Sequence, residues 1–104
     1  MNLLELEPTN LKHLIVVAIK DQVASDLGGE TVILNLKTGI YHGLDAIGSE
    51  IWNLLQNSIT VNNILNTLLQ EYDVEPERCE RELLALLQKL VDAELIEVFN
   101  EKTA

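Results

Sequence analysis

The chain has 104 residues, 47% of them hydrophobic, and its 17 acidic and 7 basic residues give a formal net charge of −10. This length and composition predict one folded domain with a modest core, and the negative charge argues against nucleic acid and anionic membranes as partners. The longest apolar run, residues 14–19, is too short to cross a membrane, and the acidic N-terminal segment lacks the basic region of a signal peptide. We therefore expect a cytoplasmic protein.

The first part of the chain predicts an antiparallel sheet. Residues 1–13 contain Pro8 and are expected to form a loosely ordered arm, because proline prevents a continuous helix there. Runs rich in β-branched residues then alternate with glycine-containing turns. The expected strands lie at residues 14–27, with a bend or bulge at 20–21, at 30–36 and at 39–44. Strands in this meander order place the third at an edge of the sheet.

The hydrophobic period then changes from that of strands to that of helices. Asp45 and Thr60 are suitable N-caps for two helices, and Pro76 suits the first turn of a third. The apolar stripe of the first helix comprises Ile47, Ile51, Leu54 and Leu55, and that of the third comprises Cys79, Leu83, Leu86, Leu87 and Leu90. We expect Trp52 to seal the first helix against the sheet, and residues 95–99 to form either a short strand or an extended tail.

These elements predict an α+β fold in which a three-stranded antiparallel sheet is followed by three helices. The topology resembles a winged helix-turn-helix, and the domain is expected to span residues 14–99, with a tail at 100–104. A winged-helix module that binds DNA needs a basic recognition helix. Residues 75–94 instead carry six acids and three bases, so a DNA-binding function is disfavoured.

The third expected strand is the candidate binding element. It contains no lysine or proline, the residues that commonly protect a sheet edge from pairing, and its glycines leave room for another backbone. An open edge of this kind accepts a peptide as an additional strand, or pairs with a second copy of the chain in a structural or dimerisation role. The candidate contact residues are Gly39, Ile40, Tyr41, His42, Gly43 and Leu44.

The other wall of a peptide site would come from the third helix, and the sequence leaves two flanks of that helix open. One flank presents Arg81, Leu84 and Gln88, and the other presents Arg78, Glu82 and Ala85. Leu84 lies too far round the helix from Leu83 to be wholly in the core, which favours the first flank. Tyr41 fits equally a lid over the core or a wall of the peptide site, and His42 also fits a surface histidine without a role.

No residue pattern predicts catalysis or metal binding. Cys79 is the single cysteine, which excludes an internal disulfide, and its place on the apolar stripe indicates a small core residue. His13 and His42 have no neighbouring cluster of carboxylates or thiols for a metal. The sequence contains neither a nucleophile-elbow motif nor a glycine-rich phosphate loop. We therefore expect a non-enzymatic protein without a cofactor or metal.

The run from Val32 to Leu55 resembles the PqqD-like family, whose members recognise the precursors of ribosomally synthesised and post-translationally modified peptides (RiPPs). The matching positions are Leu34, Gly39, Tyr41, Leu44, Asp45, Gly48, Ile51, Trp52, Leu54 and Leu55. Features of the second half extend the resemblance from about Val16 to Val98. The free-standing form is most similar to members that act with lasso peptides. Family members usually carry a glycine near the end of the third helix, whereas residues 92–96 contain none.

This resemblance implies a function without catalysis. Members of the family bind the leader segment of a precursor peptide as a strand added to the third strand, where it rests against the third helix. They present the precursor to a leader peptidase or another modifying enzyme. The resemblance therefore implies a precursor peptide as the partner, at the same edge strand that the residues themselves indicate.

Overall fold

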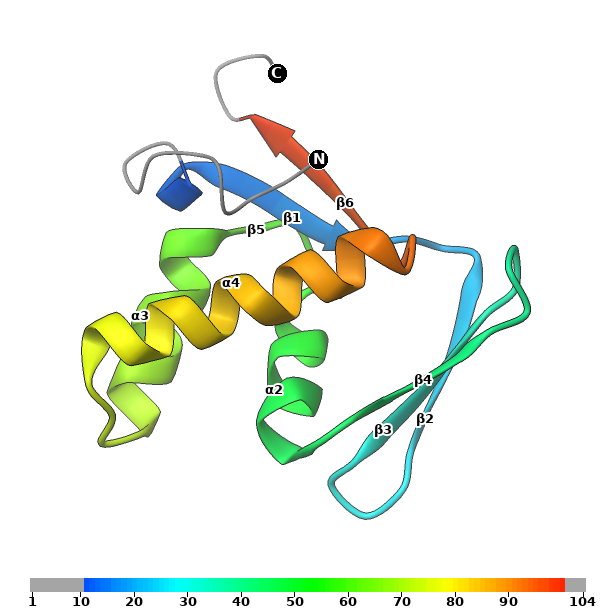
Figure 1. Cartoon of the computed structure of the whole chain (residues 1–104), viewed down its shortest axis with the longest axis horizontal. Coiled ribbons are helices and arrows are strands. Elements are labelled where there is room, and N and C mark those ends of the chain that lie inside the picture. Colours follow the sequence, from blue (N-terminus) through cyan, green and yellow to red (C-terminus); the bar gives the residue numbers. More distant parts are fainter. Residues whose placement is uncertain (1–10, 101–104) are drawn as a thin grey trace.

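The computed structural model describes residues 11–100, which form an α+β fold (Figure 1). The elements, in chain order, are β1 (Leu14–Ala18), β2 (Gln22–Asp26), β3 (Thr31–Asn35), β4 (Tyr41–Leu44), α2 (Ala46–Leu54), β5 (Ile59–Thr60), α3 (Val61–Glu71), α4 (Pro76–Asp92) and β6 (Ile96–Asn100). Most of the expected arm, residues 1–10, and the end of the expected tail, residues 101–104, lie outside the described residues. Leu11, at the described end of that arm, is buried in the core.

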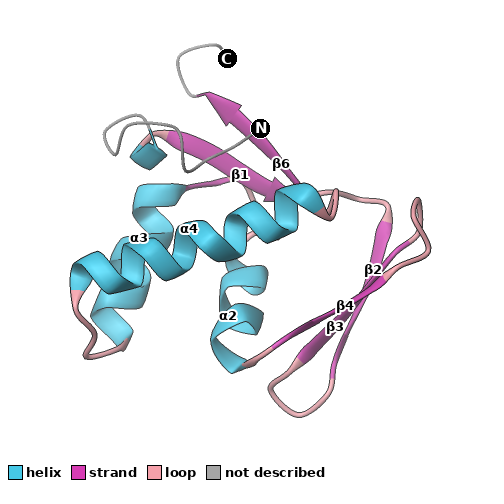
Figure 2. Ribbon diagram, viewed as in Figure 1, coloured by secondary structure: helices cyan, strands magenta, loops and turns pink. Residues whose placement is uncertain are grey.

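The strands form two separate antiparallel sheets, which the sequence did not predict. Sheet A has the order β5-β1-β6, and sheet B has the order β2-β3-β4. Figure 2 shows sheet B projecting to one side of the helices, away from β1 and β6. The predicted meander is confirmed for β2, β3 and β4, but the expectation that residues 14–18 belong to its first strand is wrong. The α+β class is confirmed, and the likeness to a winged helix-turn-helix stays a prediction.

The bend expected at residues 20–21 is the point at which the chain leaves sheet A for sheet B. Val16 in β1 has no exposed surface, and it pairs with Ile59 of β5 on one side and with Val98 of β6 on the other. A central strand pairs its backbone groups on both sides, which a buried strand requires. The strand considered for residues 95–99 is present as β6, and it completes sheet A.

Sheet B turns one face toward the core. Ile33 of β3 is fully buried, and Thr31 and Asn35 on the same face are also buried, whereas the alternate residues of this strand are half-buried. The first hairpin turn places Gly28 and Gly29 at φ 72° and 95°, as a two-residue primed turn requires. The hairpin predicted from this glycine pair is therefore confirmed.

The helices begin at the residues that the sequence indicates. The Asp45 carboxylate accepts a hydrogen bond from the Gly48 amide at 2.8 Å, and the Thr60 hydroxyl accepts one from the Asn63 amide at 3.1 Å. Pro76 lies in the first turn of α4. The two caps satisfy N–H groups that a helix leaves unpaired at its start.

The buried face of α2 differs in part from the predicted stripe. Trp52 is buried, as expected, but Ile47, a member of the predicted stripe, is 47% exposed. The first turn of α2 packs too closely on Leu44 for a large side chain, since a Cβ added at Gly48 would lie 3.3 Å from the Leu44 Cβ. Small residues therefore face the core at this turn, and Ile47 points elsewhere.

Two leucines of α4 exchange the roles predicted for them. Leu84 is buried at 7% exposure, whereas Leu86 is half-buried and faces the space beside β4. We attribute the difference to sheet A, because α4 packs on both α3 and β6 and so buries a wider arc than one stripe. The remainder of the predicted stripe is confirmed, since the buried residues of α4 are Cys79, Leu83, Leu84, Leu87 and Leu90.

The turn after α4 keeps its usual geometry without a glycine. The Leu95 amide donates to the Leu90 carbonyl at 2.9 Å, and the Glu94 amide donates to the Val91 carbonyl at 3.0 Å. These two bonds are the pattern of a Schellman motif. Glu94 adopts the left-handed conformation, at φ 57°, which glycine usually takes in this motif. The chain thus has a glutamate where the family usually has a glycine, and the turn keeps the same backbone geometry.

Candidate functional site

The strand β4 is an edge of sheet B. It pairs with β3 on one side, and no strand of the described structure lies along its other side. Hydrogen bonds of an antiparallel pair alternate along the strand. The Asn35 amide donates to the Ile40 carbonyl at 3.0 Å, and in this register every second residue from Ile40 to Leu44 bonds to β3. The backbone N–H and C=O groups of Tyr41 and Gly43 therefore point away from β3.

The bonds between β2 and β3 support the same alternation. The Leu36 amide donates to the Asp21 carbonyl at 3.1 Å, and the Leu27 amide donates to the Glu30 carbonyl at 2.7 Å. In this register, the backbone N–H and C=O groups of the even-numbered residues of β3 bond to β2, and those of the odd-numbered residues bond to β4. On β2 itself, the same rule directs the backbone N–H and C=O groups of Ala24 away from the sheet. Sheet B thus has outward-facing backbone groups on both of its edges.

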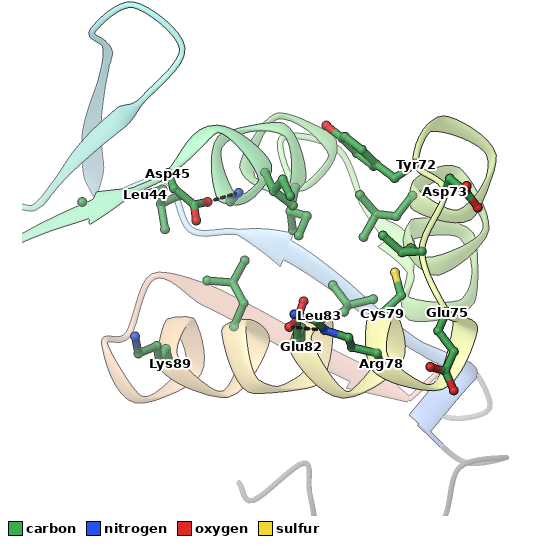
Figure 3. A pocket seen from close by; sticks show the side chains of 17 residues that line it. Leu44, Asp45, Tyr72, Asp73, Glu75, Arg78, Cys79, Glu82, Leu83 and Lys89 are labelled. Carbon is green, nitrogen blue, oxygen red and sulfur yellow. Dashed lines mark hydrogen bonds and ion pairs between the residues drawn. The ribbon is translucent and has the colours of Figure 1, made fainter.

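A continuous groove lies between β4 and α4. It consists of two hollows that share the lining residues Gly43, Leu44, Leu86 and Lys89. The first, of about 740 Å³, extends between α2 and α4 as far as Tyr72 (Figure 3). The second, of about 670 Å³, follows β4 toward the turn that precedes it and the C-terminal end of α4. We call the two hollows together the β4–α4 groove.

The first hollow has an apolar floor and a charged rim. Figure 3 shows Leu44 on one wall and Leu83 on the other, with Lys89 along the α4 side. Both leucines are buried. On the rim, Arg78 Nε and Glu82 Oε1 form an exposed ion pair at 3.1 Å. Small-molecule and peptide sites commonly combine such an apolar floor with a few polar groups.

The edge of β4 leaves space for a second backbone. Gly43 has no side chain, and a Cβ placed there would meet no atom within 4 Å. Tyr41 is 69% exposed, which excludes the role of a lid over the core. Gly39 ends the turn before β4 at φ 74°, a conformation that favours glycine. The strand is therefore open along the positions whose backbone groups face outward.

His42 lies on the groove side of β4 and is half-buried. Its Nε2 atom is buried and has no hydrogen-bond partner among the described residues. A buried nitrogen without a partner costs stability. His42 is therefore part of the groove wall. No hydrogen bond of its Nε2 atom to the described residues explains why a histidine stands at this position.

The flank of α4 that borders the groove is not the one preferred from sequence. Arg81, Leu84 and Gln88 line neither hollow, and the burial of Leu84 contradicts its expected place outside the core. Arg78 and Glu82, from the alternative flank, line the first hollow. Ala85, the third residue of that flank, lines neither hollow.

Among the groove residues that were not predicted from the sequence are Leu86 and Lys89 of α4. Both line the two hollows. With Arg78 and Glu82 they follow a spacing of i, i+4, i+8 and i+11, which places them on one face of a helix. That spacing is the sequence pattern that could have predicted the groove-facing side of α4. It was not used because Leu86 also fits the edge of the apolar stripe that predicts the core.

A pair of glutamates lies near the far end of the first hollow. The Tyr72 hydroxyl donates to Glu50 Oε2 at 2.5 Å, and this bond raises the pKa of Tyr72. A hydrogen bond between the two carboxyl groups, together with that from Tyr72, lowers the pKa of Glu50. The same carboxyl pair raises the pKa of Glu71. Elsewhere in the hollow, burial raises the pKa of the Cys79 thiol, so this thiol is not activated as a nucleophile.

Two further properties concern residues 11–100. Within this range, no group of three histidine, cysteine, aspartate or glutamate side chains is placed to hold a metal ion. No helix in the same range is long and apolar enough to cross a membrane.

Residues 30–96 match the family model described as "Coenzyme PQQ synthesis protein D (PqqD)". This chain belongs to the PqqD family. The matched residues include β3, β4 and all of α2, α3 and α4, and so both walls of the groove. The resemblance to PqqD-like RiPP recognition elements is thereby confirmed.

Two solved structures are similar to this PqqD-family protein. The structure of "TbiB1 in Complex with the TbiA(beta) Leader Peptide" has 37% sequence identity and a TM-score of 0.73, and the match covers 78% of this chain and 94% of that chain. The structure of "Lasso peptide synthetase B1 complexed with the leader peptide" has 21% identity and a TM-score of 0.70, with 79% and 96% covered, and this likeness concerns the fold. No curated protein matches the chain significantly.

Proposed function

We propose that this PqqD-family protein binds the leader segment of a ribosomally synthesised precursor peptide as a strand added to β4. The observation that carries the proposal is the open edge of β4 beside the β4–α4 groove. An added strand would pair with the outward backbone groups of Tyr41 and Gly43, and every second side chain of the peptide would enter the groove. TbiB1, which is 37% identical, is solved in complex with a leader peptide, and this supports a leader as the ligand.

The energies of such binding suit a reversible carrier of peptides. Tyr41 and Gly43 each offer one donor and one acceptor, and a ladder hydrogen bond contributes about 0.5–1.5 kcal/mol net. Two or three apolar side chains placed in the groove add about 1.5–3 kcal/mol each. After the costs of association and of ordering the peptide, the surplus corresponds to a dissociation constant roughly between micromolar and nanomolar.

We assign the selectivity for the peptide to the α4 wall of the groove. Backbone bonds to β4 carry little sequence information, so side-chain contacts must distinguish one leader from another. Leu86 and Lys89 line both hollows, and the pair of Arg78 and Glu82 lines the first. These four residues replace the flank preferred from sequence in the proposed site.

The proposed role is non-enzymatic. The protein would hold the leader and present the precursor to a leader peptidase or another modifying enzyme, within a cytoplasmic pathway. We place it in lasso peptide biosynthesis because the Ile51-Trp52 pair in α2 resembles members of that group. The proposed domain spans residues 14–99.

The Tyr41→Pro variant tests strand addition. Proline removes an N–H group that points out of sheet B, so the bonds between β3 and β4 are kept while the added strand loses a donor and meets the proline ring. A fluorescein-labelled TbiA(beta) leader peptide, titrated with the wild-type chain, should show saturable fluorescence polarisation. We expect Tyr41→Pro to weaken the affinity by about tenfold or more, the equivalent of about 1.4 kcal/mol.

Ala24→Pro is the matched control for this experiment. Ala24 has the same outward-facing place on the opposite edge of the sheet, so its substitution should leave the affinity unchanged, with circular dichroism confirming that both variants fold. Binding by Tyr41→Pro at wild-type strength contradicts strand addition to β4. A wild-type chain that does not bind the labelled leader contradicts the proposed function itself.

The open edge also supports the alternative role of a dimerisation strand. A second copy of the chain would use the same backbone groups of Tyr41 and Gly43 as the leader does. The two roles therefore compete, and a dimer formed through β4 should dissociate when the leader peptide is added. Sedimentation velocity with and without the peptide distinguishes this dimer from one formed elsewhere.

A further inference from the structure

Asn35 is a buried polar residue whose side chain connects sheet B to the end of α4. It has no exposed surface. Its Nδ2 donates to the carbonyl oxygens of Ala93 at 2.9 Å and Glu94 at 3.2 Å. Its Oδ1 accepts from the backbone amides of Lys37 at 2.8 Å and Thr38 at 3.2 Å. The full hydrogen-bonding capacity of the side chain is thus used, and the nitrogen and oxygen positions are fixed by their partners.

The partners of Asn35 stand on both walls of the β4–α4 groove. Thr38 lies in the turn that leads into β4, and it lines the second hollow. Ala93 and Glu94 follow the last turn of α4 and line the same hollow from the helix side. One buried side chain therefore joins the strand wall to the helix wall at this end of the groove.

The opposite end of β4 is held in a different way. There Leu44 is followed directly by the Asp45 cap of α2, so the chain itself fixes the strand relative to the helices. Near the turn, the Lys37–Glu94 ion pair at 3.3 Å also joins the two walls, but its side chains are 68% and 55% exposed. Exposed ion pairs contribute little. The buried amide of Asn35 is therefore the stronger of the two connections described at this end.

We propose that Asn35 is a positioning residue that fixes the separation of β4 and α4 and thereby sets the affinity of the groove for its peptide. The inference rests on the proposed leader binding and adds a residue that does not touch the peptide. Carbonyl groups at a helix end have no partner within the helix, and Asn35 uses them to hold the helix end against the hairpin. When the two walls are already held at the separation that the peptide requires, binding does not have to include the free-energy cost of ordering the groove.

The Asn35→Asp variant tests the proposal. The carboxylate keeps the acceptors for the turn but loses both donors toward α4, so we expect the labelled TbiA(beta) leader to bind about tenfold or more weakly near pH 7.5. The loss should appear mainly as faster dissociation in stopped-flow measurements. Protonation of the aspartate near pH 5 restores one O–H donor, and the affinity relative to wild type should then partly recover.

Two controls separate positioning from loss of stability. Ile64→Val removes a buried methyl group from α3, outside the groove, and lowers stability without moving either wall. Lys37→Ala removes the exposed ion pair and keeps the backbone amide that bonds to Asn35. Both variants should bind the labelled leader within about twofold of wild type, at a temperature where circular dichroism shows every variant folded.

The Asn35→Ser variant decides the question if Asn35→Asp does not fold. Serine is neutral and keeps an oxygen that can accept from the turn, but it cannot reach the α4 carbonyls, so the affinity should again fall. Folded Asn35 variants that bind within about twofold of wild type overturn the inference and leave leader binding intact. A wild-type chain that fails to bind the labelled leader overturns both proposals.

Discussion

At the scale of single residues, Glu94 carries a backbone conformation that costs an L-residue roughly 1–2 kcal/mol, at φ 57°. Besides the hydrogen bond from its amide to the Val91 carbonyl, two contacts hold it there: its carbonyl accepts from Asn35, and its carboxylate lies 3.3 Å from Lys37 Nζ. The second contact is exposed and recovers little of the cost. The glutamate side chain therefore offsets little of the conformational strain at this position.

Glu94→Gly should stabilise the protein. Glycine adopts positive φ without a steric penalty, the backbone carbonyl that accepts from Asn35 is kept, and only the exposed ion pair is lost. We expect a gain of about 1 kcal/mol in the free energy of unfolding. For a domain of this size, that corresponds to a rise of about 4–8 °C in the thermal midpoint, which circular dichroism melts can measure.

Ala93→Gly is the matched control for that variant. Ala93 precedes Glu94 but has φ −81°, a conformation in which glycine has no advantage and loses more entropy on folding. Its midpoint should stay level or fall. A Glu94→Gly chain that melts at or below the wild-type temperature contradicts the account of strain in this turn.

At the scale of elements, α4 contributes to the core with one arc of its surface and to the groove with the adjacent arc. One arc packs against α3 and β6, and the neighbouring arc borders the groove. Leu84 and Leu86 are chemically identical, yet the first is core and the second lines both hollows. The rotation of the helix about its axis therefore determines which leucine meets a peptide.

Leu86→Ala should weaken peptide binding more than it weakens the fold. A half-buried leucine that gains apolar contact from a bound peptide loses roughly 1–2 kcal/mol of that contact on truncation, so we expect the labelled TbiA(beta) leader to bind about five- to thirtyfold more weakly. Polarisation titration gives the affinity, and urea unfolding gives the stability of the same sample.

Leu69→Ala serves as the comparison for Leu86→Ala. Leu69 is a half-buried leucine of α3 that lines neither hollow, so its truncation should lower stability and leave the affinity unchanged. Equal affinities for the two variants would remove Leu86 from the proposed site and reopen the choice of flank.

At the scale of the whole molecule, the net charge of −10 places carboxylates close to one another on the surface. Repulsion among like charges destabilises the compact state. The pair of Glu50 and Glu71 is a local example, because the two carboxyl groups share a hydrogen bond and their pKa values move in opposite directions. Mild acid should relieve this repulsion.

The thermal midpoint should be higher near pH 5 than near pH 7.5. Because folding raises the pKa of Glu71 above its ordinary 4.5, the contribution of this group is full below 4.5 and is lost as the pH rises through the folded value. Folding lowers the pKa of Glu50, so its contribution is present above 4.5 and is lost only as the pH falls through its lower folded value. Both contributions coexist just above 4.5, and melts across this range measure their sum.

Glu71→Gln isolates the carboxyl pair from the remaining charge. Glutamine can still donate to Glu50 but does not titrate. The variant should therefore melt higher than wild type near pH 7.5 and show a smaller difference between the two pH values. An unchanged pH dependence would assign the effect to other carboxylates.

The sequence by itself determined the features that depend on neighbours along the chain. Gly28–Gly29 fixed the first hairpin, Asp45 and Thr60 fixed two helix starts, and the absence of lysine and proline marked β4 as an open edge. Each of these is decided by backbone conformation or by a cap within a few residues. They were enough for the fold class and for the strand half of the candidate site.

Only the tertiary structure decided which strands pair and which side of α4 borders the groove. The β1 segment continues into β2 in sequence, yet it pairs with β6 at the other end of the described chain, and no local pattern encodes a partner so distant. That pairing forms sheet A, against which α4 buries a wider arc, including Leu84. The helix half of the site follows from this long-range pairing, because packing against a second sheet sets which of two equivalent leucines stays outside the core.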